Sequence, residues 1–389
     1  MGLPSRLSLH ARHRDGPGGG HDPRDAPPQA QRRSQGAIRA GLIALLLWVW
    51  GLPALAETLR IATYNADLSR SGPGLLLLDL RKGAEQPMAV VQVLAAVHAD
   101  VILLTGIDFD LRAEALTALA EALSAADHAY PYRLALRPNT GIATGLDLDG
   151  NGTTGEPRDA QGYGRFAGEG GMAVLSRLPI DLAGVQDYSA FLWADLPGAL
   201  IPPDTPSEVR AVQRLSTGGH WAVPLILPEG GRLTLLAYYA TPPVFDGPED
   251  RNGRRNHDET AFWLRLLAGD LPFRPPPAPL VLLGQTNLDP ADGEGRREAI
   301  SALLLHPALQ DPRPRGTAPR SDPGQTGDAA LDTALYDGLG GLRVEVILPS
   351  AGLKVTGSGV LWPPEDDPLA GTLALASRHR PLWVDIALP

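Results

Sequence analysis

The segment GGMAVLSRLPI, residues 170–180, is the most informative part of this 389-residue sequence for its fold. Two glycines precede a continuous run of buried-type residues, Met172–Ser176, which predicts a strand. A loop of about 35 residues, rich in Gly and Asp, separates this run from an earlier strand-like segment at 133–137. Loops of that length inside a compact domain are usually functional or disordered.

Strand and helix signals alternate over the chain on both sides of this segment. The strand-like runs are 59–65, 101–104, 133–137, 172–176, 220–226, 232–239, 280–284, 342–348, 353–359 and 381–387, and helical spacing falls at 88–98, 111–125, 256–268 and 297–304. The stretch 311–340 carries no regular pattern and is expected to be irregular. No break in composition marks a second domain, so the sequence predicts one mixed α/β domain.

The N-terminal part of the chain is expected to be removed on export. Residues 1–36 are rich in Pro, Gly, Arg and His and should be disordered. Three arginines, the uncharged apolar run 40–52 and an A-x-A site at 54–56 then predict a signal peptide over 37–56 and a mature domain over 57–389. A membrane anchor would need roughly 20 apolar residues. An Arg-Arg pair leaves the twin-arginine route open, although the hydrophobic pair typical of such signals is missing. We therefore expect a periplasmic or secreted protein with no membrane span after cleavage.

Charge and cysteine content disfavour several classes of function. The chain has 34 Lys+Arg and 44 Asp+Glu, of which residues 1–56 hold seven and three, so the mature part has 27 against 41 and a net charge near −14. Binding of long nucleic acids needs a positive field to release counterions from phosphates, so such ligands are disfavoured. The absence of cysteine excludes disulfides, thiolate zinc sites and thiol nucleophiles. We expect a monomer.

Six segments, in order, resemble motifs of the endonuclease/exonuclease/phosphatase (DNase I-like) superfamily, which includes nucleases, sphingomyelinases and inositol phosphatases. They are LRIATYN (59–65), ADVILL (99–104), GGMAVLSRLPI (170–180), LLGQTNLDP (282–290), LRVEVILPS (342–350) and SRHRPLWVDI (377–386). The resemblance runs from Leu59 to Leu388 and implies a two-sheet α/β sandwich. Because the motifs end central strands in this superfamily, it also implies that their polar residues meet at one edge.

The resemblance implies a phosphoester hydrolase with a divalent metal, Mg²⁺ or Mn²⁺, held by oxygen ligands. In this superfamily a carboxylate and an Asn orient the attacking water, and a His assists as charge develops on the phosphate. The matching positions here are Asn65, Gln285, Asn287 and His379, which become the candidate catalytic residues.

Three acids of the superfamily pattern are replaced in this chain. Gly106 stands where the metal-binding Glu belongs, Gln285 where the water-orienting Asp belongs, and Arg378 where the Asp before the closing His belongs. Tyr239 stands at the position of a second helper His. These positions are together about four charge units more positive than usual, which weakens attraction for a dication. Arg378 and Tyr239 become candidates for binding a substrate anion.

Two other carboxylates are candidates to hold the metal instead. Glu345 stands where an Asp is typical, and Asp108 lies two residues beyond Gly106. A two-residue offset along an extended chain keeps a side chain on the same face but moves it by about 6–7 Å. The alternative for Asp108 is a solvated loop acid or a helix cap.

The long loop contains a pattern typical of calcium sites. Asp147, Asp149 and Asn151 follow the D-x-D-x-N-G order, in which alternate oxygens converge and Gly allows a sharp turn. The twelfth position is Arg158 where a bidentate Glu belongs, with Asp159 next. The loop therefore predicts either a Ca²⁺ site between Asp147 and Asp159 or a plain Asx turn.

The strongest local positive cluster lies in EDRNGRRNHDE, residues 249–259. Arg255 and its neighbouring arginines could hold a phosphate or another anion through planar guanidinium contacts. They could equally form a solvated helix end paired with the acids of the same segment.

Two hypotheses of function follow. The first is an exported, metal-dependent phosphodiesterase or phosphomonoesterase with a rearranged site and weak activity, acting on a phosphate ester or another anionic small molecule. The second is a non-catalytic exported binding protein on the same fold.

Overall fold

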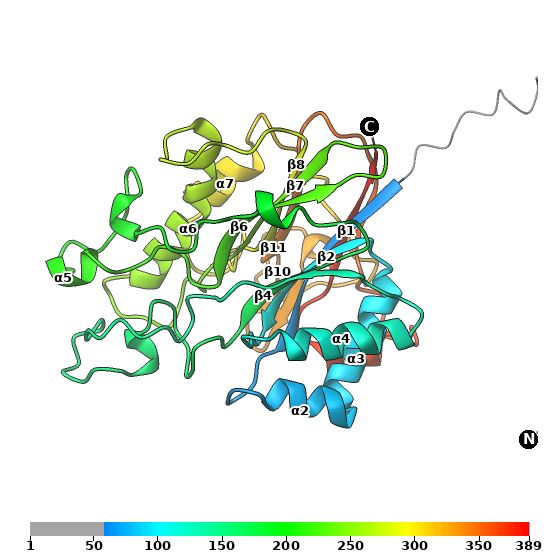
Figure 1. Ribbon diagram of the computed structural model, residues 1–389, viewed down its shortest axis with the longest axis horizontal. Helices are drawn as coiled ribbons and strands as arrows, with labels where there is room; N and C mark the ends of the chain where they lie inside the picture. Colours follow the sequence, from blue (N-terminus) through cyan, green and yellow to red (C-terminus); the bar gives the residue numbers. More distant parts are fainter. Residues whose placement is uncertain (1–57, 389) are drawn as a thin grey trace, which may run out of the picture. The chain divides into compact units, whose positions relative to one another are not determined.

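The computed structural model describes residues 58–388, so the predicted N-terminal extension (1–36) and signal peptide (37–56) lie outside the described residues (Figure 1). The described residues belong to one compact unit, Ala56–Pro389. None of the helices in this described part is long and apolar enough to cross a membrane.

The first of two main sheets contains both the first and the last strand of the domain. Its order is β12-β13-β1-β2-β4-β3. The bounds are β1 Thr58–Leu68, β2 Val101–Ile107, β3 Tyr132–Leu134, β4 Gly171–Ser176, β12 Val355–Val360 and β13 Leu382–Ala387. β1 and β2 run parallel, whereas the other neighbouring strands are antiparallel.

The second main sheet has the order β11-β8-β7-β6-β5. Its bounds are β5 Gln186–Asp187, β6 Gly219–Ile226, β7 Arg232–Tyr239, β8 Leu280–Gln285 and β11 Glu345–Pro349. β6 and β7 form the predicted hairpin, and β7 and β8 form the parallel pair of this sheet. Each main sheet thus has one parallel pair whose carboxyl ends lie at one edge.

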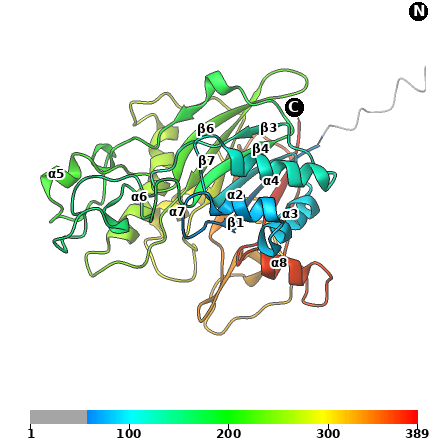
Figure 2. The same cartoon turned by 60° about the horizontal axis from the view of Figure 1, so that its bottom comes forward.

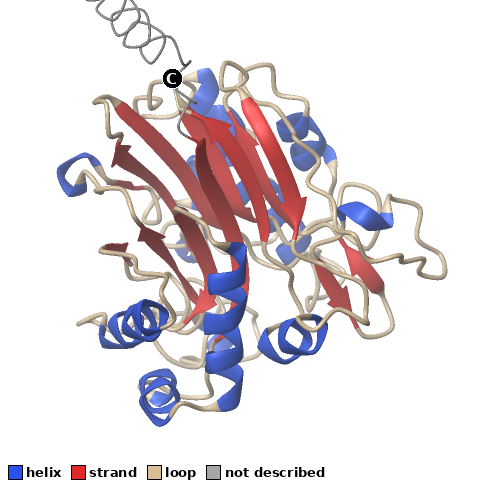
Figure 3. Cartoon of the chain, turned by 90° about the vertical axis from the view of Figure 1, so that its right-hand side faces the viewer, coloured by secondary structure: helices blue, strands red, loops and turns tan. Residues whose placement is uncertain are grey.

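Along each strand, side chains pack alternately into two hydrophobic cores, because successive side chains point to opposite faces of a sheet. In β1, Leu59 and Ile61 pack into the core between the sheets, whereas Ala62 and Tyr64 pack against helices. Burying a Leu or Ile side chain fully contributes roughly 1.5–3 kcal/mol. Figure 3 shows the strands in the middle of the domain with helices outside them.

Helices cover the outer face of each sheet, as Figure 2 shows for the first one. The first sheet carries α2 Leu75–Lys82, α3 Glu85–Val97, α4 Glu114–Ala125 and α8 Ala370–Ala376, and the second carries α6 Arg251–Ala268 and α7 Glu298–Leu304. A one-turn helix, α5 Ser207–Arg210, lies in the connection before β6. This arrangement confirms the predicted two-sheet α/β sandwich.

Several elements differ from the sequence prediction. The helix predicted from Leu111 begins at Glu114, because the Asp110 carboxylate accepts N–H groups of Glu114 and Ala115 and Ala113 takes a left-handed conformation. The stretch predicted to be irregular contains a short hairpin, β9 Ala334–Tyr336 and β10 Gly340–Leu342. β10 also takes the first residue of the strand predicted over 342–348, so β11 begins only at Glu345.

Candidate active site at the ends of the central strands

The carboxyl ends of the two parallel pairs meet where the sheets pack on each other. β1 packs on β8 and β11 of the opposite sheet. Asn65 near the end of β1 donates from Nδ2 to Gln285 Oε1 at the end of β8, at 2.7 Å. Thr105 on β2 donates to the same oxygen at 3.0 Å. One amide oxygen therefore joins three strands from both sheets.

Gln285 continues this chain of hydrogen bonds through its amide nitrogen. Its Nε2 donates to Asn287 Oδ1 at 2.6 Å, and Asn287 Nδ2 donates to the carbonyl of Ala240 at 2.7 Å. Asn65 Oδ1 in turn accepts the N–H of Asp67 at 3.0 Å. Gln285 is thus held at both ends by neutral partners.

A buried pair of side chains, Glu345 and His379, lies beside this chain of amide hydrogen bonds. Glu345 is the residue paired with Gln285 across β11 and β8, and its Oε1 lies 2.6 Å from His379 Nδ1. Both side chains are buried. His379 Nε2 has no hydrogen-bond partner among the described residues, and Glu345 Oε2 is a buried oxygen without a partner. We call Asn65, Thr105, Gln285, Asn287, Glu345 and His379 the strand-end site.

Asp67 and Arg378 border the strand-end site. Ser377 Oγ lies 2.8 Å from the Asn65 carbonyl oxygen and 2.9 Å from Asp67 Oδ2. The Arg378 N–H donates to the same Asp67 oxygen at 3.2 Å, and its Nε lies 3.7 Å away. The Arg378 side chain is 61% exposed, so its guanidinium is accessible to an anion.

Two tyrosines lie against this group. Burial raises the pKa of Tyr239, and the nearby charge of Asp67 raises it further. Burial likewise raises the pKa of Tyr336, followed by the charge of Glu345, and its ring meets the His379 ring edge-on at 6.0 Å. Sequence reasoning missed Tyr336 because it lies in the stretch predicted to be irregular, and no motif marks it.

Gly106 occupies a place where a side chain does not fit. Its φ is +65°, and a Cβ added to it would lie 2.2 Å from Asn65 Oδ1. The position that the resemblance assigns to a metal-binding Glu is therefore filled by the Asn65 amide.

The strand-end site does not fit a divalent ion at the usual place. Such an ion needs several converging oxygen ligands, most of them anionic in a tight site. Gly106 supplies none, Gln285 is neutral and held at both ends, and Arg378 adds a cation. Among the described residues, His, Asp and Glu side chains form no group of three with ligand atoms in mutual reach at this edge.

The Asp108 carboxylate, a predicted metal ligand, is instead hydrogen-bonded to backbone N–H groups. Its carboxylate accepts the N–H of Arg70 at 2.9 Å and of Gly170 at 3.0 Å, which ties the loop after β1 to the start of β4. Burial raises the pKa of Asp108 to about 6, although these hydrogen bonds oppose the shift. Asp108 and Glu345, the two candidate ligands, share no hydrogen-bonding partner.

The long loop does bring acids together. Asp147, Asp149 and Asp159 each offer an oxygen within 4.8 Å of the others. Asp147 accepts the N–H groups of Gly150 and Gly152 at 2.7 Å, and these bonds lower its pKa. This acidic triad could bind a metal ion. The Asn151 side chain donates to Glu156 and accepts the N–H of Thr153.

Arg255 is a buried structural cation in the described chain. Its Nε donates to the carbonyl of Leu215 at 2.9 Å, and its Nη2 donates to the carbonyls of Gln161, Arg214 and Ser216. Burial lowers the pKa of Arg255 to about 10, with Glu259 opposing the shift. Arg255 is thus not part of a solvated helix end, as one of the two predictions had it. Its buried guanidinium instead connects the loops that carry these carbonyl groups.

Comparison with known proteins agrees with this architecture. The sequence model of the Endonuclease/Exonuclease/phosphatase family matches residues 62–379. An endonuclease/exonuclease/phosphatase from Beutenbergia cavernae DSM 12333 is 18% identical, with 85% of this chain and 72% of that chain covered and a TM-score of 0.50. No curated protein matches the sequence.

Two further solved structures are similar at lower scores. A family protein from Leptotrichia buccalis C-1013-b is 15% identical, over 85% of this chain and all of that chain, with a TM-score of 0.48. A mannosyl-6-phosphatase from Bacteroides thetaiotaomicron VPI-5482 is 14% identical over the same shares, with a TM-score of 0.47. Because the family match spans most of the sequence, this chain belongs to the Endonuclease/Exonuclease/phosphatase family.

Proposed function

We propose that this chain is an exported phosphate-ester hydrolase of low turnover in which the buried Glu345–His379 pair transfers the proton. The observation that carries the proposal is the 2.6 Å contact between Glu345 Oε1 and His379 Nδ1, which leaves Nε2 without a partner among the described residues. Family membership supports a reaction at a phosphoester. The apolar run and A-x-A site before Glu57 support export.

The reaction needs a base, a binding site for phosphoryl oxygens and a water. Glu345 holds Nδ1 as the protonated nitrogen, so that Nε2 can accept a proton from water as its oxygen forms the new bond to phosphorus. The bond from phosphorus to the leaving oxygen breaks, and solvent protonates that oxygen. The accessible Arg378 guanidinium binds phosphoryl oxygens and takes up developing charge.

Low turnover follows from the groups at Gln285 and Gly106. Gln285 is a neutral amide that cannot deprotonate water, and both ends of its side chain are already hydrogen-bonded. Because Gly106 and Arg378 leave no usual metal centre, charge on the phosphoryl group is stabilised by side chains alone. The expected substrate is a phosphate ester or another anionic small molecule, since the acidity of the chain disfavours long nucleic acids. We expect the protein to act as a monomer.

A specific observation favours the second hypothesis, a non-catalytic binding protein. The side-chain amides of Asn65, Gln285 and Asn287 satisfy one another by hydrogen bonds. Such an arrangement is expected in a protein whose site does not activate water. In that case Arg378 would bind a phosphate ester that leaves unchanged.

The two hypotheses differ in the hydrolysis of generic substrates. We would assay the mature domain, residues 57–389, with p-nitrophenyl phosphate and bis(p-nitrophenyl) phosphate, in EDTA and with added Mg²⁺, Mn²⁺ or Ca²⁺. We expect slow hydrolysis that falls by about 100-fold or more in His379→Ala, the usual range for losing a positioned base. His306→Gln, in the turn after α7, is the matched control.

The two possible failures are distinct. Full activity of His379→Ala would contradict the assigned base. Binding of phosphate esters without any turnover would instead establish the binding protein.

Calcium is the ion that best suits the acidic triad Asp147, Asp149 and Asp159. The order D-x-D-x-N-G and the converging carboxylates support this assignment over Mg²⁺ or Mn²⁺, since Mg²⁺ demands near-octahedral geometry and usually keeps several waters. An ion there would bridge the two ends of the loop from Asp147 to Asp159.

A further inference from the structure

A cavity of about 1060 Å³ opens beside the strand-end site. Tyr239 and Ala240 line it, and the Ala240 carbonyl accepts the side-chain N–H of Asn287. Residues of the long loop, including Asp147 and Arg158, line another part of its wall. Tyr239 and Ala240 therefore connect the surroundings of the strand-end site with the cavity wall, although no residue of the strand-end site lines the cavity itself.

Four arginines border the cavity, and none of them has a carboxylate partner among the described residues. They are Arg158, Arg251, Arg254 and Arg255. Three are engaged with neutral oxygens: Arg251 with Gln213 Oε1 at 2.8 Å, Arg254 with the Glu249 carbonyl at 3.0 Å, and Arg255 with backbone carbonyls. Their direct hydrogen bonds are therefore made to neutral oxygens, while carboxylates such as Glu259 near Arg255 act on them only at longer range.

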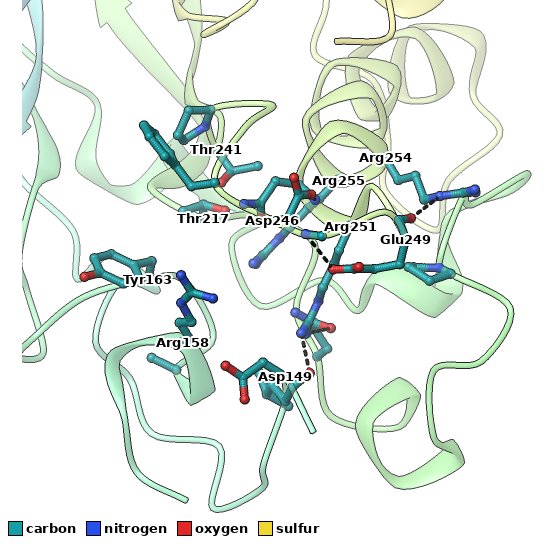
Figure 4. A pocket seen from close by; sticks show the side chains of 18 of the residues that line it. Asp149, Arg158, Tyr163, Thr217, Thr241, Asp246, Glu249, Arg251, Arg254 and Arg255 are labelled. Carbon is teal, nitrogen blue, oxygen red and sulfur yellow. Dashed lines mark hydrogen bonds between the residues drawn. The ribbon is translucent and has the colours of Figure 1, made fainter. Parts of the chain in front are cut away.

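Arg158 differs from the other three arginines. Its side chain makes no hydrogen bond or ion pair within residues 58–388, although it is exposed at the cavity wall. Figure 4 shows its guanidinium pointing into the cavity, between Tyr163 and Arg255. Arg158 is thus a cation with its donors available to a ligand.

Several of the acids that line the same cavity already accept hydrogen bonds or form an ion pair. Asp147 accepts backbone N–H groups of its own loop, Asp246 accepts the N–H of Asn252, and Glu249 accepts the N–H of Gly247. Glu169 forms an ion pair with Arg165. Asp149 and Asp204 also line the cavity, and none of these carboxylates forms an ion pair with Arg158 in the described chain.

Aromatic rings stand at the same cavity. Tyr163 is 61% exposed and Phe245 is 79% exposed, and both line the wall. In Figure 4 the Tyr163 ring lies on the same side as the Arg158 guanidinium. An exposed ring beside a cation suits a ligand that has an apolar skeleton next to an anionic group.

We propose that this cavity binds the non-reacting part of the substrate, with a second anionic group on Arg158 and the carbon skeleton against Tyr163. The proposal rests on the proposed function, since it takes the strand-end site as the place of reaction. The substrate class is then a small organic phosphate ester that carries a second negative charge, not a phosphorylated neutral alcohol. A guanidinium binds a carboxylate or phosphate by two parallel hydrogen bonds, which gives both charge and direction.

The test compares substrates that differ only in the second charge. One pair is 4-carboxyphenyl phosphate and phenyl phosphate, and an aliphatic pair is 3-phosphoglycerate and glycerol 3-phosphate. We expect kcat/KM, from release of inorganic phosphate, to favour the doubly anionic member by about tenfold or more, the usual worth of a charge-assisted hydrogen bond. In Arg158→Gln this ratio should fall to about one. Arg112→Gln, an exposed arginine outside the cavity, is the matched control and should keep the ratio.

Calorimetric titration with the same four compounds separates failure of this inference from failure of the proposed function. Preferred binding of the doubly anionic compounds, lost in Arg158→Gln but without turnover, would support the cavity assignment and refute the hydrolase. Turnover without preference in either pair, or a preference that survives Arg158→Gln, would overturn the cavity assignment and leave the hydrolase standing.

Discussion

Adding one methyl group at Gly106 should destabilise this protein far more than its backbone conformation alone requires. The added Cβ would lie 2.2 Å from Asn65 Oδ1, closer than any real Cβ contact allows. Because the obstacle is the amide of a strand-end residue, Asn65 must rotate away. The change therefore tests whether the Asn65–Gln285 hydrogen bond holds the two sheets together at the site.

The expected magnitude has two parts. A left-handed conformation costs an L-residue about 1–2 kcal/mol relative to glycine. Rotation of Asn65 breaks its bonds to Gln285 Oε1 and to the Asp67 N–H, and leaving buried partners unsatisfied costs about 1–3 kcal/mol. We expect Gly106→Ala to lower the free energy of unfolding by about 2–5 kcal/mol as the sum of these parts.

Urea unfolding followed by tryptophan fluorescence measures this loss, with Gly83→Ala as the matched control. Gly83 has nearly the same φ, +64°, but nothing lies within 4 Å of its added Cβ, so it reports the backbone part alone. In an Asn65→Ala background the added cost of Gly106→Ala should shrink to that of Gly83→Ala. Equal losses for the two single glycine variants, or no relief from Asn65→Ala, would refute the reasoning.

Three further outcomes follow from other parts of the structure. Burial raises the pKa of Asp108 from 3.8 to about 6, so the folded chain binds more protons than the unfolded chain between these values, and this group makes stability fall as pH rises through that window. Urea unfolding across it should show a flatter pH dependence in Asp108→Asn, and an unchanged slope would disprove the shift. Millimolar Ca²⁺ should raise the melting temperature of the mature domain but not that of Asp149→Ala. Equal melting curves with and without calcium would mean that the loop from Asp147 to Asp159 forms a plain Asx turn and no Ca²⁺ site. Gln285→Asp with Arg378→Asp should gain metal-dependent phosphodiesterase activity over a slow parent, and a robustly active parent that loses activity would mean that the chain uses another ligand set.

Much of the fold was predictable because its strands carry strong local patterns. The runs at 59–65, 101–104 and 280–284 are apolar and β-rich, and the structure confirms each as a central strand. The helix α2 was missed because its four leading leucines hide any helical period, and α8 because Ala370–Ala376 spans only two turns. The β9–β10 hairpin has three residues per strand, too few for a period of two to stand out.

The sequence by itself determined which chemical groups the candidate site contains. It showed that Asn65, Asn287 and His379 stand in the motif segments and that three acids are absent. Sequence order alone could reveal this because each motif is read from a few consecutive residues.

Only the tertiary structure decided how those groups are used. The Asn65–Gln285 bond joins residues 220 apart, the space at Gly106 is filled from another strand, and Arg255 turns inward to backbone carbonyls. Asp159 joins Asp147 and Asp149 only because the loop folds back on itself. The physical reason is that hydrogen-bond and ion partners are chosen by distance in space, and the packing of two sheets sets those distances between segments whose local patterns are independent.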